Sequence, residues 1–172
     1  MKRTCLLAIV LVFVACKNSS SMMGAPPANI AGTYMTVTST NSNVATYTNC
    51  TGMPATTFEG RTVADLADLS CVPTNPLVIT QTGNTWTMLN QTIVCAIANA
   101  VRSGNGTVSG SRIDGTTTLD STLNILETQT ITNGAIGTGG TVVVRVTRTT
   151  FSDSVLSGSC SIVPPLEEVW SP

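Results

Sequence analysis

Polar and apolar residues alternate along much of the chain after residue 30. From Tyr34 to Thr40 the alternation places Met35 and Val37 on one face of an extended segment. Leu77–Gln81 and Thr85–Leu89 repeat the pattern on either side of a Thr-Gly-Asn sequence. Two alternating runs joined by so short a turn signal predict a β-hairpin.

Glycine-containing turn signals divide the rest of the chain into further short runs. The signals lie at residues 103–106, 110, 114–115, 133–134 and 137–140, and strands are predicted at 44–48, 93–97, 107–109, 116–119, 122–132 and 141–151. Thr, Val and Ile are frequent in these runs, and β-branched side chains suit a pleated, half-buried surface. The predicted fold class is all-β: an antiparallel meander barrel or sandwich with one short helix in a long connection.

Two segments depart from the strand pattern. In Thr62–Leu69 the apolar residues Val63, Leu66 and Leu69 recur at helical spacing, which predicts the short helix. Near the end of the chain, Pro164-Pro165 cannot donate backbone hydrogen bonds, so the tail is not expected to be an interior strand at these prolines.

The first fifteen residues have the organisation of an export signal. Lys2 and Arg3 precede an apolar run from Cys5 to Ala15, which is shorter than the roughly 20 residues of a transmembrane helix. A buried N-terminal helix is the alternative. It is disfavoured because the polar sequence Lys-Asn-Ser-Ser-Ser follows directly after Cys16.

The end of this run, Phe13-Val14-Ala15-Cys16, resembles the lipobox of bacterial lipoproteins, with Phe where Leu is commonest. The resemblance implies cleavage before Cys16 and acylation of that cysteine with chains such as palmitate, which anchors the protein to a membrane. The large Phe13 disfavours ordinary secretory cleavage after Ala15. Lys17, in place of Asp, resembles sorting to a bacterial outer membrane. The predicted organisation is a signal peptide at 1–15, a lipidated cysteine and flexible linker at 16–29, and a single β-rich domain at 30–172.

Gly32-Thr33-Tyr34 stands at the start of the first predicted strand and is followed by successive hairpins. This arrangement resembles the beginning of lipocalin-type and avidin-type barrels. Lipocalins have Gly-x-Trp at this point, and here Tyr34 replaces the Trp. The resemblance covers three residues, so it implies a meander barrel and carries no ligand over.

Composition narrows the possible partners. Eight basic and nine acidic residues give a formal net charge of −1, and the basic residues form no cluster. Nucleic-acid binding is disfavoured because phosphate contacts need clustered Lys and Arg. A pore-forming membrane barrel is disfavoured as well, because its aromatic girdles need more than the 4% of aromatic residues in this chain.

Four cysteines remain besides those of the signal and the lipobox: Cys50, Cys71, Cys95 and Cys160. An even number in an exported chain predicts two disulfides, with four buried thiols as the alternative. Three pairings are open. Cys50 with Cys71 and Cys95 with Cys160 is favoured, because it would close a short insertion and tie a middle strand to the last one. A zinc site is not expected without His or C-x-x-C, and no cofactor is predicted.

Candidate catalytic groups are few. With no histidine, His-based triads are excluded. Arg145 and Arg148 lie on opposite faces of one strand by parity, so either would bind an anion if it faced a barrel interior, and otherwise both are surface charges. The carboxylates are candidates for an acid–base pair in glycoside hydrolysis or are solvated charges: Glu59, Asp65, Asp68, Asp114, Asp120, Glu127, Asp153, Glu167 and Glu168. The adjacent Glu167 and Glu168 should point to opposite faces.

These observations predict a non-catalytic, membrane-anchored lipoprotein of the bacterial cell envelope. It would bind a small ligand or an envelope partner, or serve structurally. The alternative is an envelope hydrolase that uses two carboxylates. An apolar-lined cavity would favour ligand binding, whereas two acids close together in one cleft would favour hydrolysis.

Overall fold

The computed structural model describes residues 26–66, 72–95, 98–123, 125–152 and 156–172. The predicted signal peptide, Cys16, most of the linker and Cys71 lie outside these ranges. The strands are β1 (Gly32–Tyr34), β2 (Thr36–Ser39), β3 (Thr46–Gly52), β4 (Val72–Pro73), β5 (Leu77–Thr82), β6 (Thr85–Val94), β7 (Asn99–Ser109), β8 (Arg112–Ser121), β9 (Leu126–Ile136), β10 (Val142–Ser152) and β11 (Ser157–Ser171). The helices are α1 (Pro54–Thr57), α2 (Val63–Leu66) and the short 3-10 helix η1 (Thr138–Gly140).

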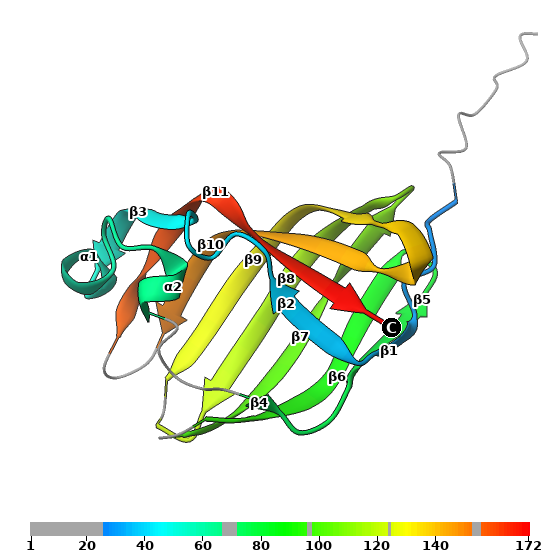
Figure 1. Ribbon diagram of the computed structural model, residues 1–172, viewed down its shortest axis with the longest axis horizontal. Coiled ribbons are helices and arrows are strands. Elements are labelled where there is room, and N and C mark those ends of the chain that lie inside the picture. The colour runs from blue at the N-terminus through cyan, green and yellow to red at the C-terminus, as the bar shows by residue number, and fades with distance from the viewer. Residues whose placement is uncertain (1–25, 67–71, 96–97, 124, 153–155) are drawn as a thin grey trace, which may run out of the picture.

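One antiparallel sheet curls until it is nearly closed into a barrel (Figure 1). The strands follow the order β1-β5-β6-β7-β8-β9-β10-β11-β2, and β3 and β4 pair beside this path with β11 and β6. Only Met35 separates β1 from β2, so one segment of chain bonds to both ends of the meander. The all-β prediction is confirmed, and of the two predicted architectures the structure is a barrel rather than a sandwich.

The change of partner at Met35 shifts the alternation along the first strand. Tyr34 is buried and Val37 is half-buried, while the Met35 side chain is 65% exposed. Met35 and Val37 therefore do not share a face, and that prediction is wrong. The backbone N–H of Met35 donates to the Ser171 carbonyl oxygen, 2.8 Å away. Met35 is therefore the point where this segment stops pairing with β5 and starts pairing with β11.

The predicted hairpin and helix are both present. β5 and β6 are joined through Gly83 and Asn84 alone. α2 begins at Val63, and residues 67–69 of the predicted helix lie outside the described part of the chain. Thr62 and Asp65 form reciprocal backbone–side-chain hydrogen bonds of 3.0 and 3.2 Å at its N-terminus, in the manner of a capping box. These bonds lower the pKa of the Asp65 carboxyl. The helix α1 was not predicted.

Several glycines predicted as turns lie inside strands instead. Gly106 in β7 is the register partner of Gly115 in β8, and both make room for the indole of Trp86 on β6. A Cβ atom would lie 2.7 Å from Trp86 Nε1 at Gly106 and 2.6 Å from its Cζ2 at Gly115. The indole N–H of Trp86 donates to the Asp114 carbonyl at 3.2 Å. The turns predicted at 103–106 and 114–115 are therefore wrong, because these glycines serve packing.

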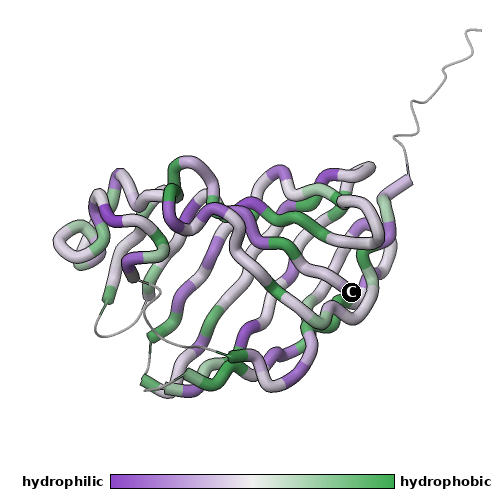
Figure 2. The backbone as a smooth tube through the Cα atoms, viewed as in Figure 1, coloured by the Kyte–Doolittle hydropathy of each residue, from purple (hydrophilic) through white to green (hydrophobic). Residues whose placement is uncertain are grey.

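An apolar core fills the end of the barrel where β1 meets β5. Trp86 and Trp170 are fully buried with ring centroids 6.3 Å apart, and Tyr34 packs edge-on against Trp170 at 6.1 Å. Figure 2 shows hydrophobic and hydrophilic residues alternating along the strands, as expected for a wall with one face inside. Ahead of β1, the Ala28 N–H donates to the carbonyl of Gly110 in the β7–β8 turn at 2.7 Å.

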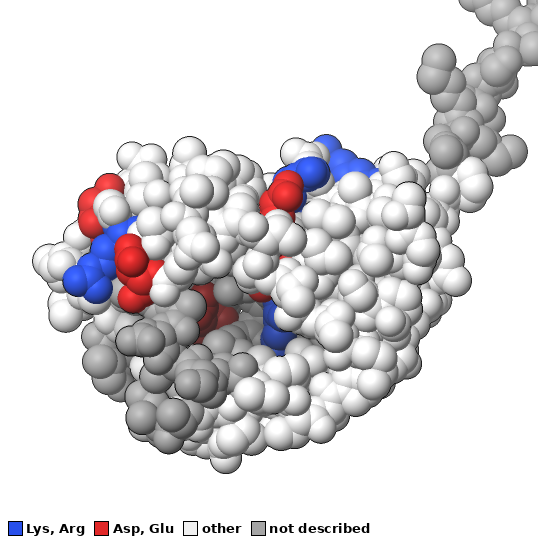
Figure 3. Space-filling model, viewed as in Figure 1, with Lys and Arg blue, Asp and Glu red and all other residues white. Residues whose placement is uncertain are grey.

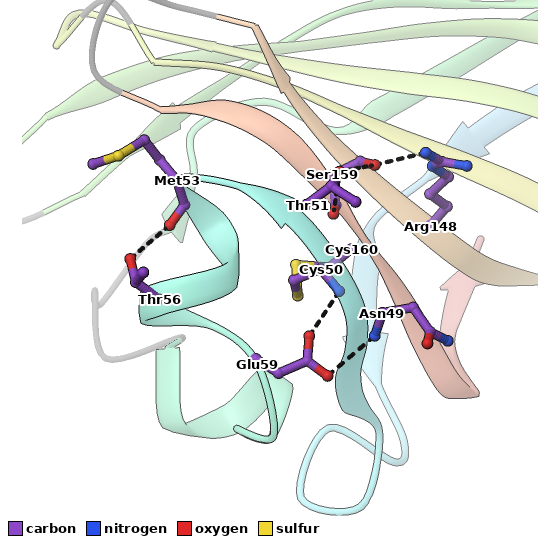
Figure 4. The surroundings of a disulfide bond; sticks show 9 residues. All are labelled: Asn49, Cys50, Thr51, Met53, Thr56, Glu59, Arg148, Ser159 and Cys160. Atoms are coloured by element: carbon purple, nitrogen blue, oxygen red, sulfur yellow. Dashed lines mark hydrogen bonds between the residues drawn. A yellow bond between two sulfur atoms is a disulfide. The ribbon is translucent and has the colours of Figure 1, made fainter.

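The opposite part of β11 carries an insertion made of β3, α1 and α2. A disulfide joins Cys50 of β3 to Cys160 of β11, with Cα atoms 4.1 Å apart (Figure 4). The favoured pairings of Cys50 with Cys71 and Cys95 with Cys160 are therefore wrong, since β3 lies beside β11 and the insertion is held from the far end of the chain. Cys95 is disulfide-bonded as well. The Glu59 carboxylate accepts the backbone N–H groups of Asn49 and Cys50 at 3.1 and 2.7 Å.

β11 continues through its two prolines. Pro164 and Pro165 fall between the residues that pair with β3, which end at Val163, and those that pair with β2, which begin at Glu168. The register with β10 also breaks there, between Val146 and Arg148. The sequence prediction thus holds for the hydrogen bonding, because the prolines occupy a gap in the ladder, although the strand itself does not end.

Candidate binding pocket in the barrel

The barrel interior becomes polar beyond the tryptophan core. Arg102 of β7 and Glu168 of β11 are 8% and 7% exposed, and Arg102 Nη2 donates to Glu168 Oε2 at 2.5 Å. The indole N–H of Trp170 donates to the same carboxylate oxygen at 3.3 Å. Inward alternation explains both positions: Arg102 lies between the buried residues Ala100 and Gly104, and Glu168 lies between Leu166 and Trp170.

This ion pair borders a cavity of about 160 Å³. Its wall consists of Ile93, Arg102, Thr117, Thr118, Leu119, Gln129 and Glu168, which come from four consecutive strands and β11. Figure 3 shows the corresponding hollow, with acidic and basic atoms visible inside it. The charged groups are therefore reachable from solvent through the barrel mouth.

Glu127 on β9 is a second carboxylate in this interior. Its Oε1 accepts a hydrogen bond from Gln129 Nε2 at 3.1 Å, and Gln129 Oε1 in turn accepts one from the Thr117 hydroxyl at 3.2 Å. Removal from water raises the pKa of Glu127, and the Glu168 charge adds to this increase. The hydrogen bond from Gln129 and the positive charge of Arg102 oppose it. Glu127 therefore holds its proton more tightly than an exposed glutamate does.

A second cavity, also of about 160 Å³, adjoins Glu127. It is lined mainly by apolar side chains, and its wall consists of Cys95, Ala98, Ala100, Leu119, Ser121, Leu123, Ile125 and Glu127. Leu119 lines both cavities, so the polar and apolar spaces share a wall. We call the two together the mouth pocket.

The insertion brings Tyr47 close enough to Glu127 for their charges to interact. Tyr47 of β3 is buried, and its ring stacks against Phe58 at 5.4 Å, which meets Phe151 of β10 at 5.1 Å. Burial raises the pKa of Tyr47, and the charge of Glu127 raises it further. Tyr47 therefore stays neutral, and among the described residues the ionisable groups that interact with Glu127 are Tyr47, Arg102 and Glu168.

Of the two alternatives for Arg145 and Arg148, the structure shows surface charges, and their predicted placement on opposite faces is wrong. Arg145 donates to Glu167 Oε1 at 2.9 Å on the outer surface, and Arg148 is exposed and donates to Ser159 Oγ at 2.6 Å. The register shift between Val146 and Arg148 adds one residue to the strand, so both arginines face outward despite their parity. Glu167 and Glu168 point to opposite faces, as predicted.

The remaining predicted carboxylates are not gathered in one site. Glu59 and Asp65 lie in the insertion, and Asp120 is exposed on the outer face of β8. Asp114 binds Arg112 at 2.6 Å and the backbone N–H of Asn133 at 3.0 Å. Partial burial opposes the resulting decrease in the pKa of Asp114, but the two hydrogen bonds outweigh it. Asp68 and Asp153 lie outside the described residues.

The described residues contain no group of three or more His, Cys, Asp or Glu side chains suited to holding a metal ion. No helix in the described ranges has the length and apolar character that crossing a membrane requires. In comparisons with known proteins, no family model, curated protein or solved structure matches the chain. Fold and pocket together define the class: a small, nearly closed antiparallel β-barrel with a charged pocket in its mouth.

Proposed function

We propose that the protein is a non-catalytic, lipid-anchored lipoprotein of the bacterial cell envelope that binds a small molecule in the mouth pocket. The observation that carries the proposal is the buried Arg102–Glu168 pair beside a cavity open to solvent. A barrel that served only as a scaffold would be more stable with apolar side chains at these positions, because a buried ion pair rarely repays its desolvation. A few polar groups in a largely apolar cavity are what ligand recognition requires.

The anchor rests on the lipobox-like sequence and needs its own test. We expect the intact mass of the protein from its native host to equal Cys16–Pro172 plus lipid. Replacing Cys16 with Ala should release the protein from the membrane fraction. A full-length, unlipidated mass would refute the anchor without bearing on the pocket.

Ligand binding is tested by screening small molecules against the purified protein by thermal denaturation. A ligand that binds the folded state raises the melting temperature in proportion to the logarithm of its concentration. Trp170 offers an independent signal, because its indole N–H bonds to the pocket carboxylate of Glu168. Hits should disappear when Leu119, shared by both cavities, is replaced by Trp, and should survive the exposed substitution Leu89→Trp. If no soluble compound stabilises the protein, the binding proposal fails.

A second candidate, hydrolysis, is favoured by one specific observation. Glu127 and Glu168 meet in the same interior, and burial keeps Glu127 protonated to higher pH, as a general acid requires. Against it, Glu168 is already engaged by Arg102 and Trp170. Chromogenic glycosides provide the test. Turnover that is lost in both Glu127→Gln and Glu168→Gln, but kept in the outward-facing Glu167→Gln, would favour the hydrolase over the binding protein.

A further inference from the structure

We propose that the ligand of the mouth pocket is a small organic cation, with its ammonium group on Glu127 and its apolar body against Leu119 and Leu123. This inference deepens the proposed function and rests on it. It is carried by the arrangement of charges, by the hydrogen bonds already formed and by the apolar wall next to the free carboxylate.

The charges in the pocket do not balance once Glu127 is ionised. The described residues around it supply two carboxylates, Glu127 and Glu168, and one guanidinium, Arg102. Arg102 is matched to Glu168 by the 2.5 Å contact, so the second carboxylate has no cation of its own at close range. A positively charged ligand would complete the pairing, whereas an anion would face both carboxylates.

The hydrogen bonds also indicate that Glu127 is the carboxylate available to a ligand. Glu168 Oε2 already accepts from Arg102 and from Trp170. Glu127 Oε1 accepts from Gln129, while Oε2 of the same carboxylate receives no hydrogen bond from any described residue. A carboxylate can accept about four hydrogen bonds, so Glu127 retains most of its capacity for a ligand donor.

The side chains around Glu127 indicate the chemical character of the rest of the ligand. Ala98, Leu123 and Ile125 line the cavity next to its carboxylate, and they offer contact to a hydrocarbon or an aromatic ring. An ammonium held against a partly desolvated carboxylate forms a charge-assisted hydrogen bond, which is about twice as strong as a neutral one. The combination favours an amine with a compact apolar body over a polyhydroxylated or anionic compound.

Proton linkage follows from this geometry. In the described part of the chain, Tyr47, Arg102 and Glu168 are the ionisable groups that interact with Glu127. Tyr47 stays neutral, so we expect Glu127 to be the group whose charge responds to the ligand. An ammonium beside it stabilises the carboxylate and lowers its pKa. Binding should therefore release protons at a pH where free Glu127 is partly protonated, and affinity should fall as the pH decreases.

Three probes of similar size test the inference: phenethylamine, 2-phenylethanol and phenylacetate. They share the benzene ring and carry a cationic, a neutral and an anionic end. By calorimetry on the purified protein at pH 7.5, we expect phenethylamine to bind at least about tenfold more tightly than either of the others. Repeating the titration in buffers of different ionisation enthalpy should show proton release in the range where Glu127 titrates.

Matched variants locate the cation. Glu127→Gln keeps the shape of the side chain and should weaken phenethylamine about tenfold or more, leaving 2-phenylethanol unchanged. Asp120→Asn removes the same charge from the exposed outer face of β8 and should alter none of the affinities. Equal losses in the two variants would mean a general effect of net charge and would overturn the assignment to Glu127.

The outcomes for the inference and for the proposed function are separable. If 2-phenylethanol or phenylacetate binds as tightly as phenethylamine, the cation inference is overturned and the binding function stands. If none of the three binds, the inference is overturned as well, and the thermal screen decides the binding function independently.

Discussion

The buried ion pair is the part of the structure whose energetics can be worked out most fully. Replacing Glu168 with Gln leaves Arg102, a residue that is only 8% exposed, without a carboxylate at hydrogen-bond distance in the described chain. Removing one partner of a buried pair costs about 3–5 kcal/mol. The adjoining cavity admits water to Arg102, so we expect the lower end, about 3 kcal/mol. For a domain of about 140 residues this corresponds to a decrease of roughly 10 °C in melting temperature.

Thermal denaturation of two neighbouring variants tests this reasoning. Glu167→Gln makes the same chemical change one residue earlier in β11, where the pair with Arg145 is 39% and 36% exposed. An exposed pair contributes about 0–1 kcal/mol, so this control should shift the melting temperature by no more than about 3 °C. Replacing both Arg102 and Glu168 with Met should recover most of the loss, because no buried charge remains. Equal small shifts in the two single variants would refute the buried-charge argument.

Three further results are expected. The pKa of Glu127 in the folded protein is above its ordinary value of 4.5, so its contribution to stability is lost as the pH rises through the folded pKa. The melting temperature of Glu127→Gln should therefore match that of the wild type at pH 4 and exceed it at pH 8. Parallel pH profiles of the two melting temperatures would contradict this. Gly115→Ala should cost about 1–3 kcal/mol in denaturant unfolding because its Cβ would lie 2.6 Å from a buried indole, whereas Gly32→Ala, with its nearest contact at 3.9 Å, should be nearly neutral. Replacing Cys50 and Cys160 together with Ala opens a loop with a sequence separation of 110 and should cost about 4 kcal/mol, and an unchanged unfolding midpoint would show that the insertion is held by packing alone.

Alternation is a sufficient guide to the fold class but not to the strand lengths. The run from Leu77 to Leu89 is correctly predicted as a hairpin, because its strands carry no internal glycine and its turn signal is unambiguous. β7 and β8 are predicted as fragments because Gly106 and Gly115 look like turn residues in one dimension. Glycine is needed at both positions because the Trp86 indole packs over them, and this contact exists only once β6, β7 and β8 lie side by side.

The pocket escapes sequence reasoning for a related reason. With a turn predicted at 103–106, Arg102 falls at the edge of a strand, and the inward set of Ala100, Arg102, Gly104, Gly106 and Val108 is not recognised. The signal for Glu168 is stronger, since it alternates with Leu166 and Trp170. Parity is misleading for Arg148, because the register shift after Val146 cannot be read from residue types. The pairing of Cys50 with Cys160 depends on strand contacts far apart in sequence, so spacing alone cannot supply it.

The hydrogen bond between Ala28 and Gly110 bears on how the barrel would be tethered if Cys16 carries the predicted lipid. It holds the start of the described chain at the β7–β8 turn, whereas the mouth pocket opens near Ala100, about 30 Å away along β7. A lipid on Cys16 would be separated from Pro26 by a chain that reaches at most about 35 Å. If Cys16 is lipidated, the tryptophan-filled end of the barrel would therefore lie nearer to the point of attachment than the mouth pocket does.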